Sequence, residues 1–559
     1  MAHGDRVPSL AELCPARGTV EEKRRAMGMG KGFDLRVEPW IPVRLLTGDP
    51  ARVGLRDLFL RAHEIGDLEL PVPPAASGLL RILGAITARI APKEGTGTRL
   101  DDADLAEDIV GWLDQRDRVL SQGRFDPAAV RAYFDGERFA GRFDLFDAER
   151  PFLQDPRLLK ECVDAKGAAN PSGVNKLVLG RPTGVNGAVL FGHFTDTDPV
   201  PVPADEAAWH LIAQLFYGPS GQCTPRRIAS AKQGNGDAGP LRKTVSFHPW
   251  AGDLFTSLVL AVPAPDDSSD AGELDTCPWE EDLPDPLGPP APLTWPGGLL
   301  TGRARHAVLL VPDADSTRVV DAYVTWSTHE PAQLARDPHL VFDLRRDGTA
   351  AAREADGARA LWRDVDALLL KQGTDGTVRP RALDDLPTGL RGRLRVRAYG
   401  FDQDGQQRDS GWFEATTPAV LQWQEEADPR MARHLARCHP AAEKVGDRLD
   451  YAARLAWKRA TDPGNDPTAK VKLDPKKPGP WAAQAGLRYW PGAERQFWQL
   501  ADPALLDTEP DRPFLDAALA ALDAAIGPAT RADIRVARAR SHARATLFAL
   551  LPTAPREAS

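Results

Sequence analysis

The sequence predicts an α+β protein, with a large mixed α/β N-terminal domain followed by a C-terminal four-helix bundle. At 559 residues the chain exceeds one typical core, so at least two domains are expected. Strand-like and helix-like patterns mix up to about residue 418, and alanine- and arginine-rich helical patterns follow. We therefore expect a loose polar tail over 1–30, a mixed domain over 31–418 and a bundle over 419–559.

The mixed domain begins with a strand-like segment over 33–46, FDLRVEPWIPVRLL, whose prolines exclude a helix. Helices are predicted over 55–65 and 77–91, the second with Ser77 as N-cap. An irregular span rich in Gly, Pro, Asn and Asp follows, before an apolar helix that stops at Gly218. Further strands are predicted over 243–247, 256–263, 305–312 and 319–326.

The C-terminal part shows apolar residues recurring at three and four positions, as in helices packed along one face. Turn signals at Pro463-Gly464 and Gly527-Pro528 divide these patterns. The helical segments are 417–438, 444–460, 492–506, 513–526 and 529–551.

The charge distribution permits nucleic-acid binding although the net charge is −9. Residues 266–285 carry nine acidic residues and no Lys or Arg. The negative charge of this one segment therefore equals the net charge of the whole chain. Basic stretches over 226–243 and 531–544 are candidate phosphate contacts. The alternative is that each is a solvated basic face.

Several classes of protein are disfavoured. No apolar run approaches membrane-spanning length and the N-terminus lacks a signal-peptide core, so a cytoplasmic protein is expected. Five dispersed cysteines without a CxxC pair argue against zinc and disulfides. The GxGxxG match at 234–239 follows a basic polar run and precedes Pro240, so no dinucleotide site is expected. His248 and His306 are interpreted as core or surface groups. We expect no catalytic residues, no metal and no cofactor.

The opening motif FDLxxEPWIPVR resembles the start of the CasA large-subunit family of the type I-E CRISPR surveillance complex, Cascade. Further motifs of the family follow along the chain in the same order as in the family, so the resemblance spans residues 33–551. It includes LRDLF at 55–59, RPFLQ at 150–154, AERQFWQL at 493–500 and ARATLFALL at 543–551.

The resemblance implies a non-catalytic antiviral subunit that binds DNA and RNA. Such subunits lie near the 5′ handle of the guide RNA (crRNA), test double-stranded DNA for the protospacer-adjacent motif (PAM) and begin R-loop formation. They contact the backbone and small subunits of the complex and the displaced single strand. They also help to recruit a separate helicase-nuclease. Guide pairing then supplies sequence specificity while protein reads the adjacent motif.

The family's DNA wedge corresponds here to the turn GFDQDGQQRDSG at 400–411, between two strand-like segments. Gln406 and Gln407 match it best, with Gln403 and Asp404 adjacent. A rigid hairpin tip with amide groups can displace a base pair from the minor-groove side. A plain exposed hairpin around Asp404-Gly405 is the alternative.

The glycine-rich region 218–239 is a second candidate, because bare backbone can lie close to a minor-groove floor. Its predicted groove residues are Gly218, Gly221, Gly234 and Gly236, and its predicted phosphate contacts are Lys232, Arg242 and Lys243. A flexible loop with a basic rim is the alternative.

Two further segments are candidates. The loop at 182–191 resembles the family's guide-handle loop, with Asn186, Leu190 and Phe191 as contacts; a buried loop anchor is equally open. A stripe of arginines at helical spacing in the last helical segment suits the phosphates of a single strand. These arginines are Arg531, Arg535, Arg538 and Arg544. The alternative is a salt-bridged helix face using Asp516 and Asp523.

Two other functions remain open. One is an enzyme of unknown type that uses His248, His306 and carboxylates of the mixed domain. The other is a purely architectural RNA-binding subunit that never touches the adjacent motif.

Overall fold

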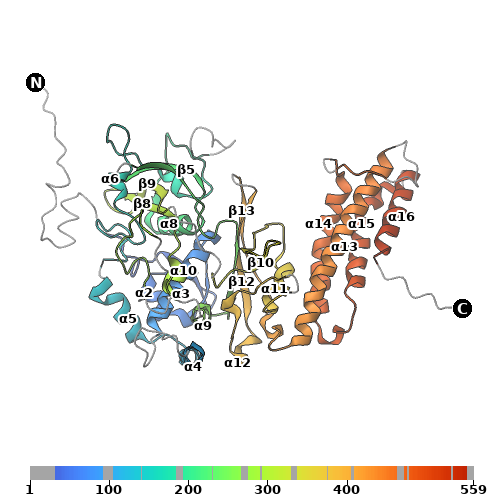
Figure 1. Cartoon of the computed structure of the whole chain (residues 1–559), viewed down its shortest axis with the longest axis horizontal. Coiled ribbons are helices and arrows are strands. Elements are labelled where there is room, and N and C mark those ends of the chain that lie inside the picture. The colour runs from blue at the N-terminus through green and yellow to red at the C-terminus, as the bar shows by residue number, and fades with distance from the viewer. Residues whose placement is uncertain are drawn as a thin grey trace, which may run out of the picture. The chain divides into compact units, whose positions relative to one another are not determined.

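A computed structural model describes the chain in two compact units, which are treated separately below (Figure 1). Unit 1 comprises Met1–Ala358 and Pro380–Ala419, and unit 2 comprises Arg359–Arg379 and Val420–Ser559. The described residues are 32–91, 105–139, 141–183, 193–228, 231–265, 275–289, 293–328, 337–373, 376–404, 408–462, 471–474, 477–530 and 533–550.

Unit 1 combines small sheets with short helices, as the α+β class requires. Its described sheets have the strand orders β2-β1-β3, β13-β12-β7, β4-β9-β8, β5-β6 and β10-β11. The strands are β1 (Ile41–Leu45), β2 (Pro50–Val53), β3 (Ile65–Leu68), β4 (Val202–Pro203), β5 (Gly221–Ile228), β6 (Ala231–Gly236), β7 (Val245–Trp250), β8 (His306–Pro312), β9 (Arg318–Trp326), β10 (Phe342–Leu344), β11 (Ala350–Ala352), β12 (Arg395–Asp404) and β13 (Arg408–Thr416).

Helices cover and connect these sheets. They are α2 (Leu55–Leu60), α3 (Pro73–Ile90), α4 (Leu105–Ser121), α5 (Pro127–Asp135), α6 (Leu158–Glu161), α7 (Val174–Leu177), α8 (Ala204–Tyr217), α9 (Leu254–Ala261), α10 (Gly297–Thr301) and α12 (Thr388–Arg391). The apolar helix predicted before Gly218 is confirmed as α8, and the last two predicted strands are confirmed as β8 and β9.

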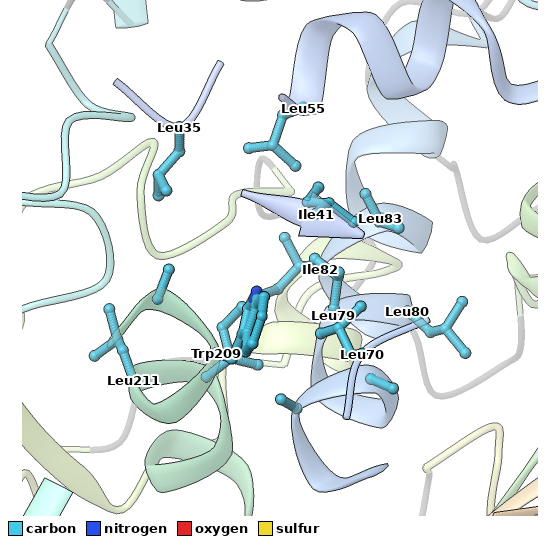
Figure 2. Close-up of a cluster of buried hydrophobic side chains, with 14 of the residues drawn as sticks. Leu35, Ile41, Leu55, Leu70, Leu79, Leu80, Ile82, Leu83, Trp209 and Leu211 are labelled. Carbon is cyan, nitrogen blue, oxygen red and sulfur yellow. The ribbon is translucent and has the colours of Figure 1, made fainter. Parts of the chain in front are cut away.

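The opening motif supplies the centre of the core. Trp40 is fully buried, and its indole Nε1 donates to the carbonyl oxygen of Leu35 at 2.9 Å. The indole of Trp209 in α8 in turn donates to the carbonyl oxygen of Trp40 at 2.9 Å. Figure 2 shows Ile41 of β1, Trp209 and leucines of α3 gathered in one cluster. The prolines therefore keep this segment extended, and Trp40 anchors it in the core.

Two local predictions in unit 1 are wrong. The segment 256–263, expected as a strand, lies mostly in helix α9, which Asp253 caps by accepting from the Thr256 amide at 2.7 Å. Every residue of α9 is buried, so its sequence shows no helical periodicity. Ser77 is not an N-cap, because α3 begins four residues earlier at Pro73. Its hydroxyl instead accepts from Tyr217 inside the core at 2.8 Å.

Unit 2 is the predicted four-helix bundle. Among its described residues four long helices pack side by side: α13 (Pro429–Thr461), α14 (Pro480–Leu500), α15 (Asp511–Thr530) and α16 (Ile534–Phe548) (Figure 1). The two patterns at 417–438 and 444–460 meet in the single helix α13, which contains Pro440. The turn expected at Gly527-Pro528 is absent, because α15 continues through it. Pro463-Gly464 lies outside the described residues.

Residues 359–379 also belong to unit 2, although the sequence analysis placed them in the mixed domain. They include α11 (Val365–Leu369). The indole of Trp362 packs on Phe497 of α14 with ring centroids 5.0 Å apart, and the Arg363 guanidinium lies 3.9 Å from the Trp490 ring centre. These aromatic contacts explain why the segment is part of the bundle.

A half-buried polar cluster gives the bundle a pH dependence. His439 Nδ1 lies 3.0 Å from Asp366, and its Nε2 lies 3.2 Å from Glu443 and 3.2 Å from the Arg359 guanidinium. Burial alone would lower the pKa of His439, but hydrogen bonds with Asp366 and Glu443 outweigh it and raise this pKa to about 9. Burial opposes the change at Glu443, yet its contacts with His439 and Arg363 lower its pKa to about 2.

We expect the free energy of unfolding of the bundle to fall by roughly 2 kcal/mol between pH 6 and pH 10. The folded state binds the His439 proton more tightly than the unfolded state does. This contribution is therefore complete below about pH 6.5 and is lost as the pH passes about 9. Urea unfolding at several pH values tests this, with His439→Gln as the reference. Parallel pH profiles for the two proteins would contradict it.

Candidate nucleic-acid interface

The predicted wedge is a two-stranded antiparallel hairpin, β12–β13. Its pairing runs from Arg397 opposite Thr416 to Asp404 opposite Arg408, with a register shift after Asp402. Such a shift twists the end of a ribbon away from its sheet. The predicted tip residues Gln406 and Gln407 lie outside the described residues, as does the side chain of Asp404.

The structure places Gln403 at the neck of this hairpin. Its amide oxygen accepts from Arg242 Nε at 3.3 Å, and its amide nitrogen donates to Asp409 Oδ1 at 3.4 Å. Both interactions lie within unit 1, and they join strands β12 and β13 to the segment after β6 that contains Arg242. Gln403 therefore holds the neck of the hairpin in place.

Arg242, predicted as a phosphate contact, is buried and engaged inside the protein. Its guanidinium donates to the Tyr217 carbonyl oxygen at 2.5 Å, forms an ion pair with Asp409 and lies 4.6 Å from the Phe401 ring centre. The Tyr217 and Phe401 rings stack with centroids 5.8 Å apart. Burial lowers the pKa of Arg242 despite the nearby Asp409 carboxylate. Arg242 is thus a structural clamp, and this corrects the predicted role.

The glycine-rich region is also a hairpin, β5–β6, and not the loop that the sequence suggested. Its strands are fixed by distant groups. Trp326 Nε1 donates to the Gln233 carbonyl oxygen at 3.1 Å, and Thr325 Oγ1 donates to the Thr224 carbonyl oxygen at 2.6 Å. Arg226, part of the predicted basic stretch, is fully buried and pairs with Asp155 at 2.7 Å. That arginine holds the hairpin on unit 1.

The glycines of this hairpin have different roles. Gly218 is buried, and a Cβ there would lie 2.6 Å from the Gln214 carbonyl oxygen and 2.7 Å from the His306 ring. The amide of Gly239 donates to the Gly218 carbonyl oxygen at 2.8 Å, which closes the base of the hairpin. Gly218 is therefore required for packing and presents no exposed surface to a groove.

The other predicted glycines are more accessible. Gly221 is exposed, has a φ of +113° and has open space where a Cβ would point. Gly234 and Gly236 are half-buried, beside Pro225 and Trp326 respectively. Lys243 is half-buried with a φ of +67°. The side chain of Lys232 lies outside the described part of the hairpin.

On the last bundle helix the predicted arginine stripe is partly neutralised. Arg544 forms an ion pair with Asp523 of α15, as does Arg540 at 2.8 Å. Arg535 pairs with the N-cap carboxylate Asp533 at 2.8 Å. The Arg544 contact agrees with the salt-bridged alternative, whereas Arg535 pairs only with the N-cap of its own helix and Arg538 is exposed. Arg531, Asn186, Leu190 and Phe191 lie outside the described residues.

The histidines considered for catalysis are buried. His248 stacks on His339 with ring centroids 4.3 Å apart, and burial lowers its pKa well below the ordinary value. Burial also lowers the pKa of His306 to about 4. Within the described ranges no group of His, Cys, Asp and Glu is arranged to hold a metal ion. Among those same residues no helix is long and apolar enough to span a membrane.

The neck of the β12–β13 hairpin contains one candidate residue, Asp409, that the sequence analysis missed. Asp409 joins Arg242 and Gln403, although it lies 167 residues from Arg242 in sequence. No local pattern marks it, since a single acid in a polar turn is ordinary. Arg242, Gln403 and Asp409 together form what we call the neck cluster, which ties the segment after β6 to the β12–β13 hairpin.

Comparison with known proteins identifies the family. The sequence model of the family described as CRISPR-associated protein Cse1 matches residues 34–531, which is most of the chain. The chain belongs to the Cse1 family. This confirms the resemblance seen in the sequence, because Cse1 and CasA name the same protein in a Thermus thermophilus relative. That relative is 29% identical over 441 residues, covering 77% of this chain and 78% of its own length.

Solved structures agree with the Cse1 assignment. A chain of a "CRISPR RNA-guided surveillance complex" is 41% identical, with 92% of this chain and 99% of that chain covered and a TM-score of 0.79. The crystal structure of Thermobifida fusca Cse1 matches with a TM-score of 0.69 and 19% identity, over 93% of this chain and 98% of that chain. At that identity the second match shows the fold alone.

Proposed function

We propose that this Cse1-family chain is the non-catalytic large subunit of an RNA-guided surveillance complex, where it recognises the PAM in double-stranded DNA. The β5–β6 hairpin reads the minor groove with exposed backbone at Gly221. The tip of β12–β13 enters the duplex and starts R-loop formation. The subunit then helps to recruit the helicase-nuclease. Its partners are the crRNA handle, the displaced strand and the other complex subunits.

One observation supports this proposal above the others. The two segments predicted to touch DNA lie 160 or more residues apart in sequence, yet the neck cluster joins them within unit 1. A groove reader and a wedge need such a fixed spacing, because both must meet the same few base pairs. The burial of Arg242 makes this connection rigid, since its guanidinium contacts a backbone carbonyl, an amide, a carboxylate and a ring.

The proposed function predicts the effect of removing the wedge amides. In the reconstituted complex, Gln406→Ala with Gln407→Ala should weaken binding to PAM-containing duplex about fivefold to tenfold, as expected for losing groove contacts near one base pair. Binding to target that is already single-stranded should not change. Electrophoretic mobility shift at fixed salt measures both.

The matched control replaces two exposed glutamines of α14, Gln484→Ala with Gln499→Ala. These should leave duplex binding unchanged. A purely architectural subunit would show equal duplex affinity for the wedge variant and the wild-type protein. That result would contradict the wedge while leaving membership of the complex intact.

A further inference from the structure

A cavity of about 330 Å³ lies in unit 1. Its wall is mostly apolar, and its rim carries both arginines and carboxylates. The apolar wall includes Ile82, Leu153, Leu215, Phe216 and Val308, and the rim carries Arg142, Arg150 and Arg157. Cavities of this size, apolar with a few placed polar groups, commonly take whole small organic molecules.

One side of the cavity is closed by residues Asp275–Asp285, which we call the acidic strap. The strap is fixed at its start, where Arg89 contacts Asp275 at 2.6 Å and Glu280 at 3.0 Å. Tyr133 also donates to Glu280 at 3.0 Å. These buried contacts account for part of the acidic segment that the sequence left without a role.

The other end of the strap lies over the arginines of the rim. Asp282 forms an ion pair with Arg150 and lies 3.9 Å from Arg142, although its side chain is 93% exposed. Arg157 donates to the Pro284 carbonyl oxygen at 3.0 Å. An exposed carboxylate contributes little through such an ion pair. Asp282 therefore occupies a position in which an external anion can replace it.

The backbone of the lining is strained at one position. Leu153 adopts a φ of +55°, which costs free energy in a non-glycine residue and is concentrated at binding sites. His306 also lines the cavity, but its Nδ1 is buried against Gly218 and its Nε2 lies 3.1 Å from the Pro219 carbonyl oxygen. The ring therefore contributes its face to the wall.

We propose that this cavity binds one nucleotide, with its base against the apolar wall near His306 and its phosphate on Arg142 and Arg150 in place of the Asp282 carboxylate. Guanidinium groups suit a phosphate because they donate in a planar fork. A base brings a flat apolar face, which suits the apolar wall. The choice of a nucleotide over other anions with a flat apolar part rests on the proposed function.

Isothermal titration calorimetry on the full-length protein tests this, with AMP, CMP, GMP, UMP and inorganic phosphate as separate probes. We expect at least one nucleotide to bind more tightly than phosphate. Asp282→Asn should lower its Kd about twofold to fivefold, because it removes the competing carboxylate. Arg150→Gln should raise the Kd. The control Asp347→Asn, which removes an acid from an exposed turn, should have no effect.

A second variant, Ala304→Leu, reduces the cavity without changing charge and should weaken nucleotide binding but not phosphate binding. A 5′-phosphorylated oligonucleotide distinguishes the sources: tighter binding than the mononucleotide indicates a strand, and weaker binding indicates a free nucleotide. Absence of binding by all four nucleotides, or weaker binding by Asp282→Asn, would overturn the proposal. The proposed function is judged separately, since the wedge variant should bind these nucleotides normally.

Discussion

Replacing Asp337 with asparagine is expected to lower the free energy of unfolding of unit 1 by about 3–5 kcal/mol. The Asp337 carboxylate is the shared partner of two buried guanidiniums, Arg81 at 2.6 Å and Arg303 at 3.0 Å. It also accepts from the His339 amide at 3.0 Å. Burial alone would raise its pKa, but Arg81 and Arg303 outweigh burial and lower it. An amide cannot balance two positive charges in a dry interior.

Urea unfolding followed by tryptophan fluorescence measures this change. Asp343→Asn is the matched control, because Asp343 also forms an ion pair, with Arg353 at 2.6 Å, but is 44% exposed. The control should cost less than about 1 kcal/mol. Equal losses for the two variants would show that burial of the Asp337 cluster is energetically unimportant.

Replacing Arg242 with methionine is expected to weaken PAM-duplex binding by the assembled complex about tenfold or more, and to cost about 1–3 kcal/mol of stability. Methionine keeps the apolar packing but leaves the Tyr217 carbonyl oxygen without its donor. Asp409 is 39% exposed and can regain water, so the full penalty of a buried lone charge does not apply. The neck of the hairpin loses the contacts of Arg242, and the proposed wedge loses its fixed spacing from β5–β6.

Two comparisons make the Arg242 result specific. Arg242→Lys keeps the charge but cannot contact the carbonyl, the amide and the carboxylate together, so an intermediate affinity is expected. Arg353→Met removes an arginine that contacts Asp343 at the β10–β11 hairpin and should leave duplex binding unchanged. Wild-type duplex affinity for Arg242→Met would contradict the role of the neck cluster.

The sequence predicted those parts of the fold that depend on local pattern. The bundle helices, α8 ending before Gly218, and strands β8 and β9 all follow from periodicity and turn residues. Helix α9 was missed because a segment buried on every side has no periodic pattern. The β5–β6 hairpin was taken for a loop because distant groups, Trp326 and Arg226, fix its strands.

The candidate interface was predictable in outline only. Family resemblance located the two hairpins, but charge alone assigned Arg242 to phosphate. Its pairing with Asp409 depends on chain folding over 167 residues, which no short pattern records. Basic residues in a stretch look alike in sequence, whereas their burial differs greatly: Arg226 is fully buried and Arg538 is exposed.

The assignment of residues 359–379 to the bundle has a practical result for protein engineering. The polypeptide passes between the two units three times, after Ala358, Arg379 and Ala419. A fragment that begins at Val420 would lack Trp362 and expose the aromatic surface of α14 that it covers. A soluble isolated bundle therefore requires the 21-residue piece Arg359–Arg379 to be joined to it by an artificial linker.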